Sequence, residues 1–85
     1  MKVNESKILR TMVKTYQDEL DDVLEDYNLI GAVLGLLKRH GVPEDWDTVR
    51  LLCRRQNKIV DKMKGIQENL DKAQEELKAV EEAKE

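Results

Sequence analysis

The chain has 85 residues, enough for one small domain. Charged residues make up 39% and aromatic residues 4%, with a single proline, a composition typical of long helices. One cysteine cannot form an internal disulfide, which excludes a small secreted domain held together by disulfides. The longest uncharged run, residues 27–37, is shorter than the roughly 20 residues that span a bilayer, and the first residues lack an apolar signal core. We therefore expect a cytoplasmic protein without a membrane segment.

The first half of the chain has the apolar pattern of a helix with one buried stripe. Apolar side chains recur at alternating spacings of four and three residues, which average to the period of a coiled-coil seam. These seam positions are Leu9, Val13, Tyr16, Leu20, Val23, Tyr27, Ile30, Leu34 and Leu37. Asn4 is a residue type that caps helix N-termini. The pattern predicts a first helix over about residues 5–40.

A turn is predicted at residues 41–43. Gly41 can adopt the left-handed backbone conformation that closes a helix, and Val42 would then return onto Leu37 in a Schellman motif. Pro43 suits the first position of the next helix, because its missing N–H would be unpaired there anyway.

The second half continues with a seam of the same period. Its positions are Val49, Leu52, Gln56, Ile59, Met63, Ile66, Leu70, Ala73, Leu77 and Val80. This predicts a second helix over about residues 43–83, and the short link forces the two helices to run antiparallel. The expected fold is all-α: a two-helix antiparallel coiled-coil hairpin that forms a single domain over residues 1–85.

The charges are arranged in blocks that fit this hairpin. Residues 1–14 carry a net charge of +3 and would lie beside residues 72–85, which carry −2. Residues 18–26 contain six carboxylates and no basic side chain. They would lie near residues 60–68, which contain two lysines and two carboxylates, with a further lysine at residue 58. Opposed blocks of this kind help to set helix orientation and register, although each exposed pair contributes little.

A second apolar stripe on the first helix is left uncovered by the hairpin. It lies one residue before each seam position, and it is apolar at both ends and acidic in the middle. Two hairpins that cover it would form a four-helix bundle as a homodimer; alternatively, it would take a helix of another protein. Trp46 either packs over the turn or is exposed as a contact for a partner. The predicted protein interface consists of Ile8, Met12, Leu29, Val33, Leu36, Trp46, Leu51 and Cys53.

The start of the second helix is basic. Residues 48–65 carry a net charge of +5, and further basic residues end the first helix. Such a patch is the electrostatic signature of a phosphate-binding or acid-binding surface, although the chain as a whole is acidic. The candidate contacts are Lys38, Arg39, Arg50, Arg54, Arg55 and Lys58.

The sequence contains few of the residue types on which catalytic sites depend. With one histidine and one cysteine, no catalytic triad or metal cage is expected, and we predict no catalytic, cofactor-binding or metal-binding residue. In architecture alone, the chain resembles small dimeric helical hairpins. The predicted function is that of a non-enzymatic protein–protein interaction module; the alternative is a nucleic-acid-binding regulator that uses the basic patch.

Overall fold

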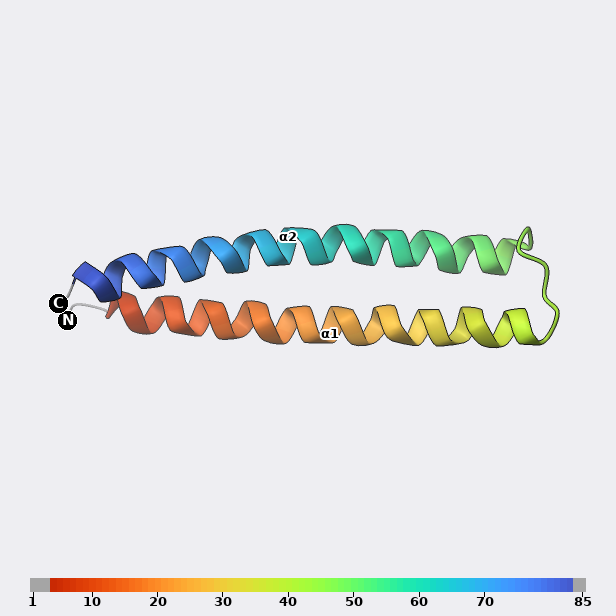
Figure 1. The fold of residues 1–85 in the computed structure, drawn as a ribbon, viewed down its shortest axis with the longest axis horizontal. Coiled ribbons are helices and arrows are strands. Elements are labelled where there is room, and N and C mark those ends of the chain that lie inside the picture. Colours follow the sequence, from red (N-terminus) through yellow and green to blue (C-terminus); the bar gives the residue numbers. More distant parts are fainter. Residues whose placement is uncertain (1–3, 84–85) are drawn as a thin grey trace.

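The chain folds into a hairpin of two long helices. The computed structural model describes residues 4–83, and within them α1 spans Glu5–Arg39 and α2 spans Asp47–Ala83, with no strand. The helices lie side by side and antiparallel, with the turn at one end and both termini at the other (Figure 1). Neither helix contains a stretch long and apolar enough to cross a membrane. The predicted all-α helical hairpin is thus confirmed.

The N-terminus of α1 is capped as the sequence predicts. Asn4 has an extended backbone, and its side-chain oxygen accepts hydrogen bonds from the backbone N–H groups of Ser6 at 3.1 Å and Lys7 at 3.4 Å. These donors have no partner inside the helix, so the cap supplies one. Replacing such a cap by alanine typically costs about 1 kcal/mol.

The C-terminus of α1 ends in the predicted Schellman motif. Gly41 has a φ of 79°, and its N–H donates to the carbonyl of Lys38 at 3.0 Å. The N–H of Val42 donates to the carbonyl of Leu37, also at 3.0 Å. The two bonds satisfy carbonyls that would otherwise lack partners, and the basic residues Lys38 and Arg39 lie at the negative end of the helix dipole.

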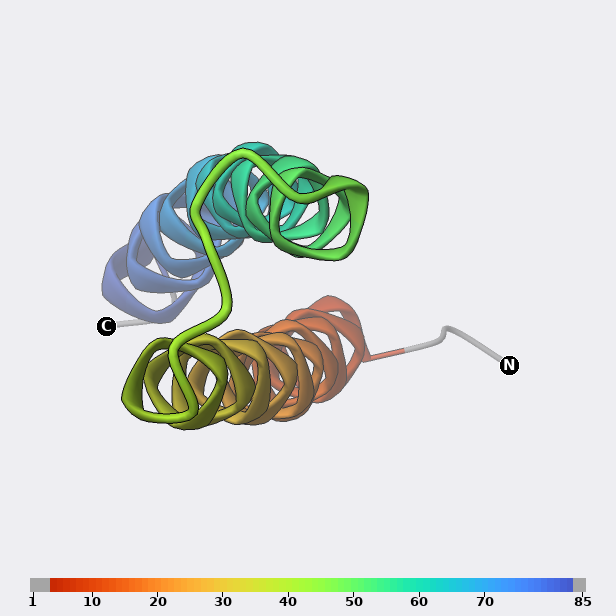
Figure 2. The same cartoon turned by 90° about the vertical axis from the view of Figure 1, so that its right-hand side faces the viewer.

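The predicted start of the second helix is wrong by four residues. α2 begins at Asp47, so the turn extends beyond residues 41–43 and Pro43 does not occupy the first helical position. Instead, the carbonyl of Pro43 accepts a hydrogen bond from the N–H of Trp46 at 3.2 Å, and the carbonyl of Trp46 accepts the bond from Arg50 that starts α2. The physical reason is the distance between the two helices, which the chain must span before the second helix can begin. After the Schellman motif the chain must cross to an axis about 8–10 Å away before it can coil again (Figure 2).

The two helices meet along the predicted seam. Every seam position of α1 and of α2 is buried or half-buried, including the polar Gln56. Gln56 lies over Gly31: its Nε2 is 3.5 Å from the place where a Cβ at Gly31 would be. Viewed from the turn end, the helices cross at a shallow angle, so that their ends are displaced to opposite sides (Figure 2).

Burial along the seam is unequal. The buried residues on α1 are Ser6, Leu9 and Val23, and those on α2 are Ile66, Leu70 and Ala73. Val23 lies at the middle of α1, and the other five lie in the half nearer the chain termini. In the half nearer the turn, the seam residues are only half-buried. No described side chain is less than 2% exposed. The hairpin thus has a covered stripe at one end and no closed core.

One ion pair links the helices near the termini. Both Nε and Nη2 of Arg10 donate to Oε1 of Glu81, at 3.1 and 2.8 Å, which matches the predicted opposition of charge blocks at this end. Both side chains are exposed, so the pair is worth at most about 1 kcal/mol. Within residues 4–83 it is the only ion pair closer than 4.0 Å, and the acidic block at residues 18–26 forms none.

The glycines of α1 and the turn give a paired stability test. Gly41→Ala should lower the free energy of unfolding by about 1–2 kcal/mol, because alanine is strained at a positive φ. Gly35→Ala should raise it by about 0.5–1 kcal/mol, since alanine favours the helix and a Cβ there meets nothing within 4 Å. Urea unfolding at one fixed protein concentration measures both changes. Equal effects of the two substitutions would contradict the Schellman turn.

Candidate protein-binding surface

The seam divides the surface of the hairpin into two long faces. We define face A by the residues that immediately precede seam positions, and face B by those that immediately follow them. Because the helices are antiparallel, each face takes residues from both of them. A cleft on face A is lined by Asp26 and Leu29 of α1 and by Arg55 and Lys58 of α2. The Arg10–Glu81 ion pair lies on face B.

Face A carries most of the exposed apolar surface. Six of the eight large hydrophobic side chains that are exposed in the described chain lie on it. They are Ile8, Met12, Leu29, Val33, Leu36 and Leu51. The largest exposed fractions among them are 64% for Leu29 and 55% for Leu51. Single exposed hydrophobic residues are common on proteins, whereas a row on one face makes that face a candidate interaction surface.

The chemistry of face A changes along its length. Near the turn it is mainly apolar, with Leu29, Val33 and Leu36 from α1 and Leu51 from α2, and with Arg55 of α2 in the same cleft as Leu29. Near the termini it is apolar again, at Ile8 and Met12, which border a shallow hollow on α1.

Between these apolar ends, face A is charged. Here α1 presents Glu19, Asp22 and Asp26, and α2 presents Lys58 and Lys62. Each helix thus contributes charge of a single sign to the middle of the face.

The seam is open to both faces in the half near the turn. On face A, a cleft of about 430 Å³ reaches the seam residues Ile30 and Ile59. On face B, a cleft of about 330 Å³ reaches the seam residues Leu34 and Val49. These openings explain why the seam residues of this half are only half-buried.

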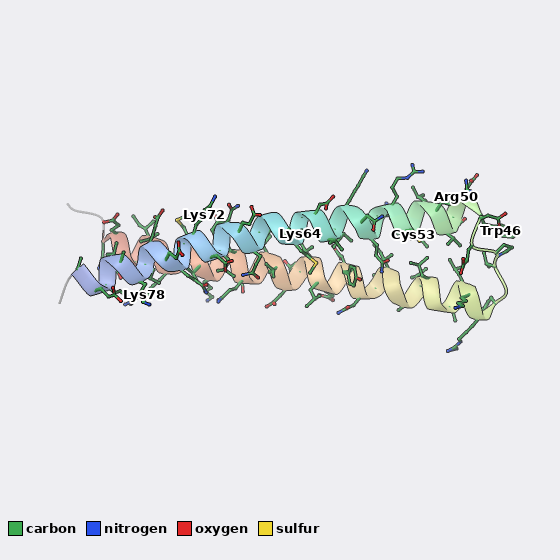
Figure 3. All side chains as sticks on the ribbon, turned by 45° about the horizontal axis from the view of Figure 1, so that its top comes forward. Trp46, Arg50, Cys53, Lys64, Lys72 and Lys78 are labelled. Atoms are coloured by element: carbon green, nitrogen blue, oxygen red, sulfur yellow. The ribbon has the colours of Figure 1, made fainter. Side chains whose placement is uncertain are left out.

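Three apolar residues lie outside face A. Trp46, in the turn, is 55% exposed, so it stands at the surface at the turn end (Figure 3). Cys53 is exposed and lines the cleft on face B, although it was predicted together with Leu51. The two differ by about 200° around α2, which puts them on different sides. Leu24, also on face B, is 42% exposed and was not predicted; its position directly after a seam residue is the signal for it.

The basic residues do not form one surface. Arg55 and Lys58 share the face A cleft with Asp26, whereas Lys38 lines the face B cleft together with Glu44. A further hollow, on the outside of α2, is lined by Asp47, Arg50, Leu51 and Arg54. Arg50 projects away from α1 (Figure 3). Arg39 is exposed in the last turn of α1. Each hollow that contains a predicted phosphate contact therefore also contains a carboxylate.

The comparisons with known proteins assign neither a family nor a function to the chain. The chain matches no family model, no curated protein and no solved structure. Within residues 4–83, no group of three or more histidine, cysteine, aspartate or glutamate side chains is placed to hold a metal ion. The interpretation of function consequently depends on the surface of the hairpin itself.

The division of the basic residues predicts weak binding to nucleic acid. A fluorescent DNA duplex titrated with the protein at physiological salt should bind with a Kd weaker than about 10⁻⁴ M, the weak limit of non-specific binding. The reason is that the net charge of −3 repels phosphate, and that each hollow of residues 4–83 with a predicted phosphate contact also holds a carboxylate. A micromolar Kd that rises steeply with salt concentration would instead support the hypothesis of a nucleic-acid-binding regulator.

Proposed function

We propose that the protein is a non-enzymatic protein–protein interaction module that associates with itself through face A. Two hairpins would pack these faces together and form a four-helix bundle, with the seams acting as coiled-coil contacts. The observation that carries the proposal is the concentration of exposed hydrophobic side chains on one face of a hairpin that has no closed core.

The accessible surface supports a second copy as the occupant. The hairpin exposes 6985 Å², whereas a compact monomer of 9.9 kDa exposes about 5,200 Å². The excess is larger than the roughly 800 Å² per partner that a standard interface buries. The shape agrees, because extents of 61 × 21 × 14 Å describe a slab one helix thick. A second slab would give the two-layer architecture from which stable domains are built.

The turn end supplies a separate contact in this proposal. Trp46 lies in the turn rather than in a helix, so it remains accessible when face A is covered. An exposed tryptophan is a residue type that often dominates the binding energy of protein interfaces. The assembled bundle would therefore offer Trp46 to a partner protein.

A charge placed on face A should prevent assembly. Leu36→Glu would bury an unpaired carboxylate in the interface, which should raise the Kd of the dimer at least about tenfold. Leu24→Glu is the matched control, because Leu24 is also a leucine of α1 with a similar exposed fraction, 42% against 49% for Leu36, but on face B. Light scattering after gel filtration, over a series of protein concentrations, measures the mass of each variant.

The wild type should have twice the chain mass of 9.9 kDa, and Leu24→Glu should keep that mass. Circular dichroism should show similar helix content in all three proteins, since glutamate is a good helix former. A wild-type monomer at every concentration would contradict the proposal. So would a Leu36→Glu variant that remains a dimer.

A further inference from the structure

Face A can meet a second copy of itself in two symmetric ways, and its charges distinguish them. The proposed self-association leaves open whether the two turns lie at the same end of the bundle or at opposite ends. In both arrangements the contact is isologous, so that each copy offers the same patch. We propose that the two turns lie at the same end. This inference depends on the proposed function.

With the turns at the same end, the two-fold axis runs along the bundle. Each α1 then lies across from α2 of the second copy at the same level. The acidic middle of α1, at Asp22 and Asp26, faces the basic middle of α2, at Lys58 and Lys62. The face A cleft fixes the level, because Asp26 and Lys58 both line it. The dimer thus has two equivalent attractive contacts. In each of them, the acidic middle of α1 from one copy meets the basic middle of α2 from the other.

The apolar ends match in part in this arrangement. Near the turn, Leu36 of one copy lies at the level of Leu51 of the other, because Gly31 and Gln56 lie side by side five residues away on each helix. Leu29 lies at the level of Arg55 and Lys58, which line the same cleft. Near the termini, Ile8 and Met12 face the end of α2, where Ala79 and Glu76 occupy face A. The opposite charges between the two ends therefore carry the choice of orientation.

With the turns at opposite ends, the two-fold axis crosses the bundle at its middle. Each α1 then lies antiparallel on α1 of the other copy, and full overlap places the centre of α1, Asp22, on its own symmetry mate. The carboxylates of Glu19 and Asp26 are brought to the same region. No basic side chain of α1 lies between residues 18 and 26, so this arrangement sets like charges against each other.

A distance between the two turns tests the orientation directly. The variant Asp45→Cys, made in a Cys53→Ser chain, allows one nitroxide to be attached at the exposed turn of each copy. Pulsed dipolar spectroscopy should give a distance within about 30 Å, since packed helices lie only 8–10 Å apart. A distance approaching the 61 Å length of the hairpin would overturn the inference while leaving self-association intact. If the labelled and unlabelled chains are monomers by light scattering, the proposed function itself fails.

Neutralising the acidic middle of face A gives an independent test. Asp22→Asn with Asp26→Asn should raise the dimer Kd about threefold or more, because attraction to the basic helix of the second copy is lost. The control is Asp18→Asn with Asp21→Asn, which makes the same change in net charge on the same helix but outside face A. The control should bind as tightly as the wild type or tighter, since the chain becomes less negative. A lower Kd for the face A variant would indicate that like charges had been opposed, and would overturn the inference.

Discussion

Two helices in contact can cover only one stripe of each other, and this constraint governs the rest of the molecule. The seam residues lie between α1 and α2, yet no described side chain is fully enclosed, because nothing packs on the seam from above or below. Ordering a chain of this length costs on the order of 100 kcal/mol of conformational entropy, which burial must offset. The hydrophobic side chains of face A are where further burial is available, so the geometry of a two-helix hairpin itself argues for a partner.

The helices were predictable because their signals are local. The alternation of three and four residues places the seam correctly over both helices, and the caps at Asn4 and Gly41 depend on neighbouring residues only. The start of α2 was not predictable in the same way. Pro43 is compatible with both a helix start and a turn, and the choice depends on the distance to the other helix, which no local pattern contains.

The candidate surface was predictable in part. The side of α1 that carries Leu29, Val33 and Leu36 follows from helical spacing alone, and the structure places these residues at the surface. The predicted basic residues do not share one surface, because residues that are close in sequence point in different directions around α2. Arg54 and Arg55 are neighbours in the chain but line different hollows. The position of Leu24 directly after a seam residue is visible in the sequence, but its exposed fraction depends on the positions of both helices.

The unequal burial along the seam has a consequence for motion. Regions with few buried contacts open locally at a lower free-energy cost than regions with many. The half near the termini contains Leu9, Ile66 and Leu70, and Val23 lies at the middle, whereas no described residue closer to the turn is buried. Fluctuations of the hairpin should therefore be concentrated in the half that carries the larger apolar patch and the clefts. A molecule that docks there would cover the half of the hairpin that is least buried in the isolated chain. Binding would therefore be coupled to the local ordering of that half.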